Sequence, residues 1–129
     1  MSAPTPFQPP PRTWLNKFRD AFVGVYLGVA GQSSFLVHGL AFLAVLVLGV
    51  VLHIAAWEWA AVLIVSGLVF TLELVNSALE NLARSITVNH DLHIDRALKI
   101  ASAAVLVAAG VAILIGLIIF GPPLWQLVS

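Results

Sequence analysis

Three polar side chains interrupt an otherwise apolar stretch in the middle of the chain, and their types could support chemistry. Glu73, Asn76 and Glu80 are spaced i, i+3 and i+7, which places them on one face of a helix over ~10 Å. A charge inside a membrane span costs roughly 2.5 to 3.5 kcal/mol. Two carboxylates with an amide between them can hold Mg²⁺, position a phosphate and deprotonate a hydroxyl. Hydrogen bonding between helices, and a proton or ion path, remain open as alternatives.

A second polar cluster follows in the loop at 81–98. It contains His90, Asp91, His93 and Asp95. A His-x-x-His pair flanked by acids could ligate zinc, although such a loop is more often simply solvated. The chain has no Gly-rich phosphate loop of the Walker type and no serine-centred nucleophile motif.

The composition indicates the medium in which these groups must be held. Of 129 residues, 60% are hydrophobic and 9% are charged, and the mean hydropathy is +1.03. Soluble domains carry roughly 25% charged residues, so we predict a small integral membrane protein of one domain. Six basic and six acidic residues give zero net charge, which argues against a nucleic-acid partner. The absence of cysteine excludes disulfides and thiol chemistry.

The apolar pattern predicts an all-α membrane protein. Residues 1–13 form a Pro-rich tail that we expect to be disordered. The single domain then covers 14–129. It begins with an amphipathic helix over 14–31, suited to the membrane interface. Three segments long enough to cross a bilayer follow, at about 35–56, 59–82 and 99–120.

Features of the last segment predict how it ends and packs. Gly121, Pro122 and Pro123 are expected to stop its helix. Small residues recur at four-residue spacing within it, where another helix of this chain or of a second chain can approach closely. They are Ala104, Ala108, Ala112 and Gly116.

The basic residues predict the orientation in the membrane. All six fall before the first span or between the second and third spans. They are Arg12, Lys17, Arg19, Arg84, Arg96 and Lys99. The positive-inside rule assigns that side to the cytoplasm. We therefore expect a multi-pass protein of the inner (cytoplasmic) membrane, with its N-terminus inside and its C-terminus outside.

The segment Glu73–Glu80, Glu-Leu-Val-Asn-Ser-Ala-Leu-Glu, resembles the signature of the small prokaryotic diacylglycerol kinase family, which includes the undecaprenol kinases. Ser102-Ala103-Ala104-Val105 resembles the family segment at the same distance from this signature. The amphipathic helix that leads through Phe35 into the first span resembles the family layout. The similarity covers about residues 14–120.

This resemblance implies a homotrimer with active sites between neighbouring chains at the cytoplasmic surface. The implied reaction transfers the γ-phosphate of ATP to a lipid alcohol, either diacylglycerol or undecaprenol. Glu73 matches the proton acceptor beside the lipid, and Asn76 matches its partner. Glu80 matches a ligand of Mg²⁺ and ATP, and Ser102 falls near the lipid. The loop at Asn89, His90 and Asp91 falls where the family contacts nucleotide, although the residue types differ.

The chain departs from the family pattern at three positions. Gln32 stands where the family has a glutamate of the metal site, and its amide oxygen can ligate Mg²⁺ without contributing charge. Leu98 and Lys99 replace a Lys-Asp pair that contacts ATP in the family. Asp95, four residues before Lys99, could supply the missing acid, but a plain i, i+4 ion pair is the favoured interpretation.

We therefore predict a lipid kinase that uses ATP and Mg²⁺. Two other classes remain open from the sequence. One is a membrane component that keeps this fold without catalysis. The other is a small oligomeric ion or proton conductor that uses Glu73 and Glu80.

Overall fold

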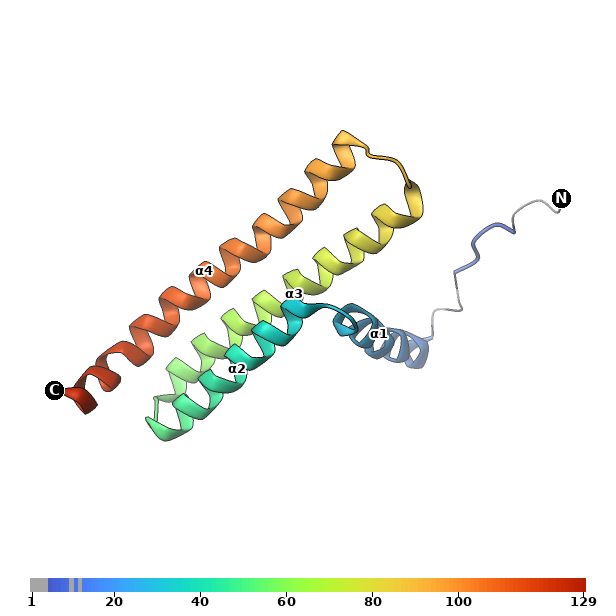
Figure 1. The fold of residues 1–129 in the computed structure, drawn as a ribbon. Coiled ribbons are helices and arrows are strands. Elements are labelled where there is room, and N and C mark those ends of the chain that lie inside the picture. Colours follow the sequence, from blue (N-terminus) through green and yellow to red (C-terminus); the bar gives the residue numbers. More distant parts are fainter. Residues whose placement is uncertain (1–4, 10, 12) are drawn as a thin grey trace.

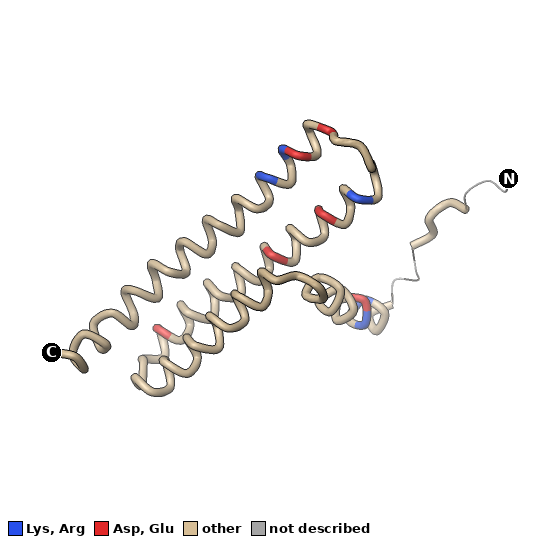
Figure 2. Tube along the Cα trace, in the orientation of Figure 1, with Lys and Arg blue, Asp and Glu red and all other residues tan. Residues whose placement is uncertain are grey.

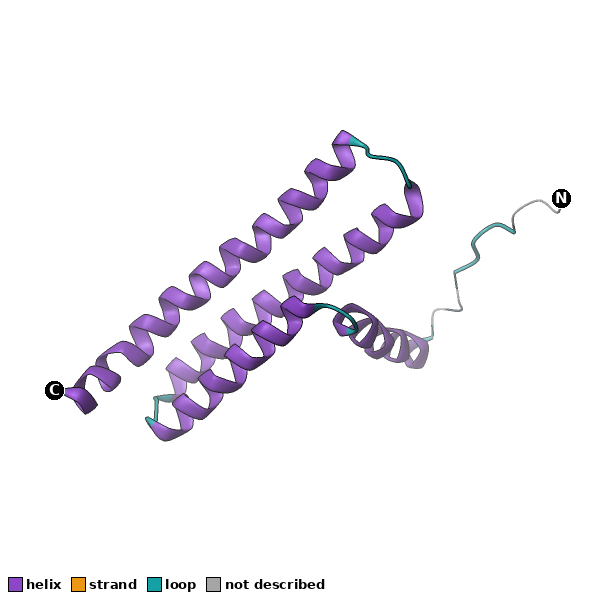
Figure 3. Cartoon of the chain, in the orientation of Figure 1, coloured by secondary structure: helices purple, strands orange, loops and turns teal. Residues whose placement is uncertain are grey.

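The computed structural model describes residues 5–9, 11 and 13–129. Over these residues the chain forms four helices and no strand (Figure 3). The prediction for the tail falls partly on residues 1–4, 10 and 12, which lie outside the described residues. The helices are α1 (Trp14–Val29), α2 (Ser33–Val51), α3 (Ala56–Ile86) and α4 (Leu92–Val128).

Three of these helices, α2, α3 and α4, are long and apolar enough to cross a membrane. The predicted all-α membrane fold is therefore confirmed. The 19 residues of α2 span ~28 Å, close to the ~30 Å of a bilayer core. The 31 and 37 residues of α3 and α4 span ~46 and ~55 Å. The α3–α4 hairpin consequently extends past the first residues of α2 (Figure 1).

The turn between the first two spans comes earlier than expected. Helix α2 ends at Val51 rather than near Ala56, and His53 takes a φ of 52° within the turn. Helix α3 already begins at Ala56 because the Glu58 carboxylate accepts a hydrogen bond from the Ala55 N–H at 2.7 Å. A carboxylate in the first turn satisfies a free backbone donor and favours helix formation there.

The prediction that Gly121, Pro122 and Pro123 end the last helix is wrong, because α4 continues through both prolines to Val128. The two prolines lack backbone N–H groups and so remove one helix hydrogen bond each, but the fixed φ of proline is compatible with a helix. Regular bonding is present beyond them, where the Ser129 N–H donates to the Trp125 carbonyl at 3.1 Å.

The buried face of α3 is a single stripe whose chemistry changes along the helix. Its apolar part consists of Val62, Val65 and Val69, and its polar part of Glu73 and Ser77. These positions recur every three or four residues, the spacing of one helical face. Helix α3 packs chiefly against α4, where Ala108 is buried. The stripe of small residues on α4 thus meets a helix of its own chain at this point.

Helix α1 has no buried residue and carries exposed apolar side chains, including Trp14, Phe18 and Phe22. The C-terminal end of α1 approaches α3, where the Ser77 hydroxyl donates to the Gly28 carbonyl at 3.4 Å. An amphipathic helix that exposes its apolar face beside the spans fits the predicted place at the membrane interface.

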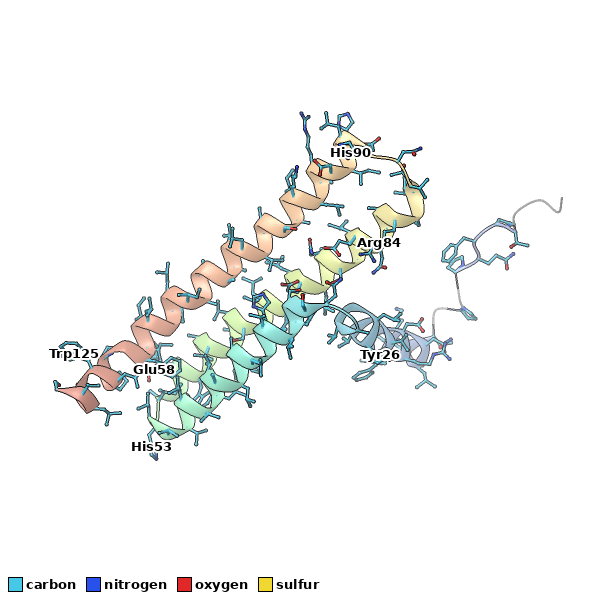
Figure 4. The ribbon with its side chains drawn as sticks, in the orientation of Figure 1. Tyr26, His53, Glu58, Arg84, His90 and Trp125 are labelled. Atoms are coloured by element: carbon cyan, nitrogen blue, oxygen red, sulfur yellow. The ribbon has the colours of Figure 1, made fainter. Side chains whose placement is uncertain are left out.

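The two ends of the hairpin differ in charge. Figure 2 shows the Lys and Arg residues on α1 and around the α3–α4 connection. Glu58 lies at the opposite end, near His53 and Trp125 (Figure 4). The polar face of α3 is therefore at the end of the molecule that carries the basic residues.

A close approach of α2 to α3 gives a test of this packing. A Cβ on the buried Gly49 would lie 2.6 and 2.7 Å from two ring carbons of Trp59. We expect Gly49→Ala to lower the free energy of unfolding by about 1 to 3 kcal/mol, the typical cost of overpacking. Thermal unfolding in detergent measures this loss.

Gly39→Ala is the matched control, because Gly39 lies on the same helix and a Cβ there would meet nothing within 4 Å. We expect no loss of stability for this variant. Equal melting temperatures for the two variants would contradict the placement of α2 against Trp59.

Candidate active site

The carboxylate of Glu73 is buried, with only 4% of the residue exposed. Both of its oxygens have partners on α2. His38 Nε2 lies 3.0 Å from Oε1, and the Ser34 hydroxyl donates to Oε2 at 3.2 Å. Ser34 and His38 are four residues apart and therefore share one face of α2. Helix α2 thus supplies the polar surroundings of a carboxylate on α3.

Aromatic packing holds α2 against α3 beside this carboxylate. The ring of Phe70, one turn before Glu73, stacks on Phe35 with centroids 6.2 Å apart. The same ring meets Phe42 edge-on at 5.8 Å. Such pairs contribute about 0.5 to 1.5 kcal/mol beyond the burial of area. On α2, Phe35 lies between Ser34 and His38 and Phe42 follows His38 by one turn, so the aromatic contacts are made beside both partners of Glu73.

Glu80 lies two turns farther along the same helix, and its side chain is 28% exposed. Its Oε1 accepts a hydrogen bond from the Asn76 amide at 3.0 Å, and its Oε2 accepts one from the Gln32 amide at 3.4 Å. Arg84 approaches the same Oε2 at 3.7 Å. The structure thus brings together Gln32, Asn76 and Glu80, three residues that the sequence singled out, although Asn76, expected as the partner of Glu73, is hydrogen-bonded to Glu80 instead.

A polar groove of about 390 Å³ opens beside Glu80 at the end of the hairpin. Arg84 and His90, which line it, both lie at this end of the molecule (Figure 4). Asn89 and Asp91, the other loop residues predicted to meet nucleotide, line the groove as well. Glu80 and the loop residues 89–91, which the sequence placed in separate segments, therefore line one groove that faces water.

The loop residues also have structural roles. Asp91 caps α4, since its carboxylate accepts hydrogen bonds from the His93 and Ile94 N–H groups at 2.8 and 3.1 Å. These backbone hydrogen bonds lower the pKa of Asp91 from its ordinary value. No three His, Asp or Glu side chains in the described ranges are grouped to hold a metal. The zinc interpretation of His90 and His93 therefore gains no support.

Two further sequence candidates lie on α4. Asp95 pairs with Lys99 at 2.8 Å, as the favoured interpretation of that spacing predicted. Ser102 is exposed, and its hydroxyl donates to the Leu98 carbonyl at 3.0 Å. Within this chain, Ser102 is not part of the group around Glu73.

Comparison with known proteins decides the family. The family model described as prokaryotic diacylglycerol kinase matches residues 19–120. The chain belongs to this family.

Two curated relatives support the assignment. The chain is 34% identical over 117 residues to an undecaprenol kinase of Bacillus subtilis, covering 88% of this chain and 95% of the relative. It is 36% identical over 115 residues to a diacylglycerol kinase of Synechocystis, covering 88% of this chain and 65% of that protein. No solved structure matches significantly. The chain is therefore a membrane-embedded lipid kinase.

The oxygen donors around Glu80 fit the divalent metal that a kinase of this family implies. The Oδ1 atom of Asn76 is buried and has no hydrogen-bond partner among the described residues, a state that costs about 1 to 3 kcal/mol. This atom, the Glu80 carboxylate and the Gln32 amide oxygen are hard oxygen ligands that would hold such an ion once the two amides, whose N–H groups here face Glu80, turn toward it. Mg²⁺ typically takes one or two carboxylates and completes its shell with phosphates and water.

Sequence reasoning did not assign a role to three residues of this site: Ser34, His38 and Arg84. The available signal was His38, because a titratable side chain inside an apolar span is by default a functional candidate. Its partner on α3 could not be inferred from spacing. The Ser34 hydrogen bond to Glu73, for example, joins residues 39 positions apart.

Proposed function

We propose that this lipid kinase transfers the γ-phosphate of ATP, with Mg²⁺, to the hydroxyl of diacylglycerol or undecaprenol at the cytoplasmic membrane surface. One observation carries the proposal. The same face of α3 presents a buried carboxylate, Glu73, and two turns later a partly exposed one, Glu80, in a polar groove. A lipid hydroxyl and a nucleotide phosphate need these two environments side by side.

The surroundings of each carboxylate support different tasks. An apolar groove of about 340 Å³ lies between α2, α3 and α4, and it is lined by His38, whose Nε2 lies 3.0 Å from the Glu73 carboxylate. This gives Glu73 an apolar approach suited to a lipid. Glu80 instead borders the polar groove with Arg84 and the loop residues Asn89, His90 and Asp91, where a charged nucleotide can be bound.

In the proposed reaction, Glu73 accepts the proton of the lipid hydroxyl while the hydroxyl oxygen forms a bond to the γ-phosphorus of ATP. The bond from that phosphorus to the β,γ-bridging oxygen breaks, and ADP leaves. Glu80, Asn76 and Gln32 would hold Mg²⁺, which when bound neutralises phosphate charge. Positioning and charge neutralisation supply most of the rate in phosphoryl transfer.

The departures from the family pattern bear on nucleotide binding. Leu98, where the family has a lysine, lines the polar groove and contributes no charge. Lys99 is paired with Asp95. Arg84 is 71% exposed at the same groove, and we assign to it the positive charge that attracts the phosphates. Ser102 retains its proposed place near the lipid through a site shared with a neighbouring chain.

Family membership favours catalysis over the two alternatives, a non-catalytic membrane component and an ion or proton conductor. We also propose the orientation with the N-terminus inside and the C-terminus outside. It is supported by the basic residues around the α3–α4 connection and on α1 (Figure 2). We further propose a homotrimer, as the resemblance to the kinase family implies.

The two carboxylates should respond differently to the same substitution. Glu73→Gln removes the base and keeps the shape, so turnover should fall by about 10²- to 10⁴-fold with little change in ATP affinity. Glu80→Gln removes metal-binding charge, so the Mg²⁺ requirement and the apparent KM for ATP should both rise. Purified protein, labelled ATP and both lipids, assayed side by side, measure these effects.

Glu58→Gln is the matched control, since it is the same substitution on the same helix at the opposite end of the molecule. It should leave turnover unchanged. If Glu73→Gln and Glu80→Gln also phosphorylate lipid at the wild-type rate, then the catalytic assignment is wrong and the polar face of α3 only joins helices.

The orientation is tested by a reporter fused after Ser129. With three spans and the positive-inside rule, the fusion should show periplasmic or extracellular activity. A second fusion placed before Trp14 should report from the cytoplasm. Reversal of both signals would overturn the proposed orientation.

The trimer is tested by native mass spectrometry in mild detergent, together with chemical cross-linking. We expect a species of three chains that carries the kinase activity. An active monomer would refute both the trimer and the idea that the site needs a neighbouring chain.

A further inference from the structure

The buried carboxylate of Glu73 has an unusual set of partners for a proposed proton acceptor. A buried charge is costly unless it is hydrogen-bonded, and here both partners come from α2. The charged groups nearer the water are engaged elsewhere, because Arg84 lies beside Glu80 and Lys99 beside Asp95. His38 is therefore the nitrogen donor on which Glu73 depends.

The geometry leaves Glu73 free to react while it is held. His38 Nε2, at 3.0 Å, occupies one site on Oε1, and Ser34 occupies one on Oε2. An ionised carboxylate has about four acceptor sites on its two oxygens. One site on each oxygen consequently remains for the hydroxyl of the lipid.

We propose that His38 and Ser34 are positioning residues for Glu73, with His38 the main one. The inference rests on the proposed function, in which Glu73 accepts the hydroxyl proton. A free glutamate side chain samples several rotamers, and the hydrogen bond from Ser34 together with the 3.0 Å contact from His38, both on one rigid helix, favours one of them. Holding a reacting group in place is worth a large part of catalysis, since a misplacement of 1 Å can cost ~10²-fold in rate.

The position of His38 makes this role specific to the lipid side of the site. Its side chain is 24% exposed and lines the apolar groove between α2, α3 and α4. A lipid that enters from this groove reaches Glu73 past the imidazole. The nucleotide groove, by contrast, is lined by Glu80 and Arg84 and does not include His38. Loss of His38 should therefore alter turnover and spare ATP binding.

The test compares His38→Leu, which removes the donor, with His38→Gln, whose amide nitrogen can occupy the place of Nε2. His38→Leu should lower kcat by roughly 10²-fold with the apparent KM for ATP unchanged. His38→Gln should recover kcat to within about tenfold of wild type, since its amide N–H can again contact the Glu73 carboxylate. His53→Leu, at the opposite end of the molecule, is the control and should leave kcat unchanged.

A double variant separates positioning from a structural role. If His38 acts through Glu73, then His38→Leu added to Glu73→Gln should cause little further loss of kcat. Ser34→Ala provides a second route if His38→Leu does not fold, and it should lower kcat by roughly tenfold. Melting temperatures of all variants are measured beside the rates.

The outcomes distinguish the two proposals. Wild-type kcat in Glu73→Gln would refute the proposed function. A large loss in Glu73→Gln with wild-type kcat in His38→Leu and Ser34→Ala would overturn the positioning role alone. The positioning role is also overturned if the losses of His38→Leu and Glu73→Gln multiply in the double variant, or if His38→Gln folds normally and is as slow as His38→Leu.

Discussion

A carboxylate buried at the end of an apolar helix stripe is the constraint on which the rest of this structure depends. Glu73 continues the row of Val62, Val65 and Val69, so the face that builds the core also carries the charge. Burial of an ionised group is tolerated only with hydrogen-bonding partners. Helix α2 must therefore lie close enough to supply Ser34 and His38. The aromatic cluster around Phe70 brings α2 to that position.

Unequal helix lengths set the depth of the site. Because α2 is about as long as the bilayer core is thick, its first residues would lie near the boundary of a membrane that it crosses. Helices α3 and α4 continue beyond this boundary and form the polar groove there. Two turns of α3 thus separate a buried carboxylate, Glu73, from a partly exposed one, Glu80. The proposed transfer of a phosphate from a water-soluble nucleotide to a lipid needs this change of medium over a short distance.

Local periodicity predicted that the spans are helices and predicted the polar face of α3, because helix spacing alone places Glu73, Asn76 and Glu80 together. The predicted loop at 81–98 was wrong in extent, since α3 runs to Ile86 and α4 already begins at Leu92. Periodicity was insufficient where tertiary packing decides. The partnership of His38 with Glu73 depends on how two spans are paired, which no spacing within one span encodes. At the C-terminus, Pro122 and Pro123 were predicted to end the last helix because proline usually breaks helices, whereas α4 continues through them. Ile119 and Phe120 pack against Val62 just before the prolines and hold that end of α4 in place.

The exchange of a family glutamate for Gln32 has a consequence for the metal site. Two carboxylates close together repel each other unless a cation lies between them. Here the Gln32 amide donates to Glu80 at 3.4 Å, and Asn76 donates to the same carboxylate. These hydrogen bonds relieve the Glu80 carboxylate through amide N–H groups, so in the proposed site the two amides must turn to offer their oxygens to a metal. The set also carries one negative charge fewer, so a larger share of the attraction for Mg²⁺ must come from the phosphates of the nucleotide. In such a site the metal and the nucleotide should bind as one unit, since neither has a complete set of partners without the other.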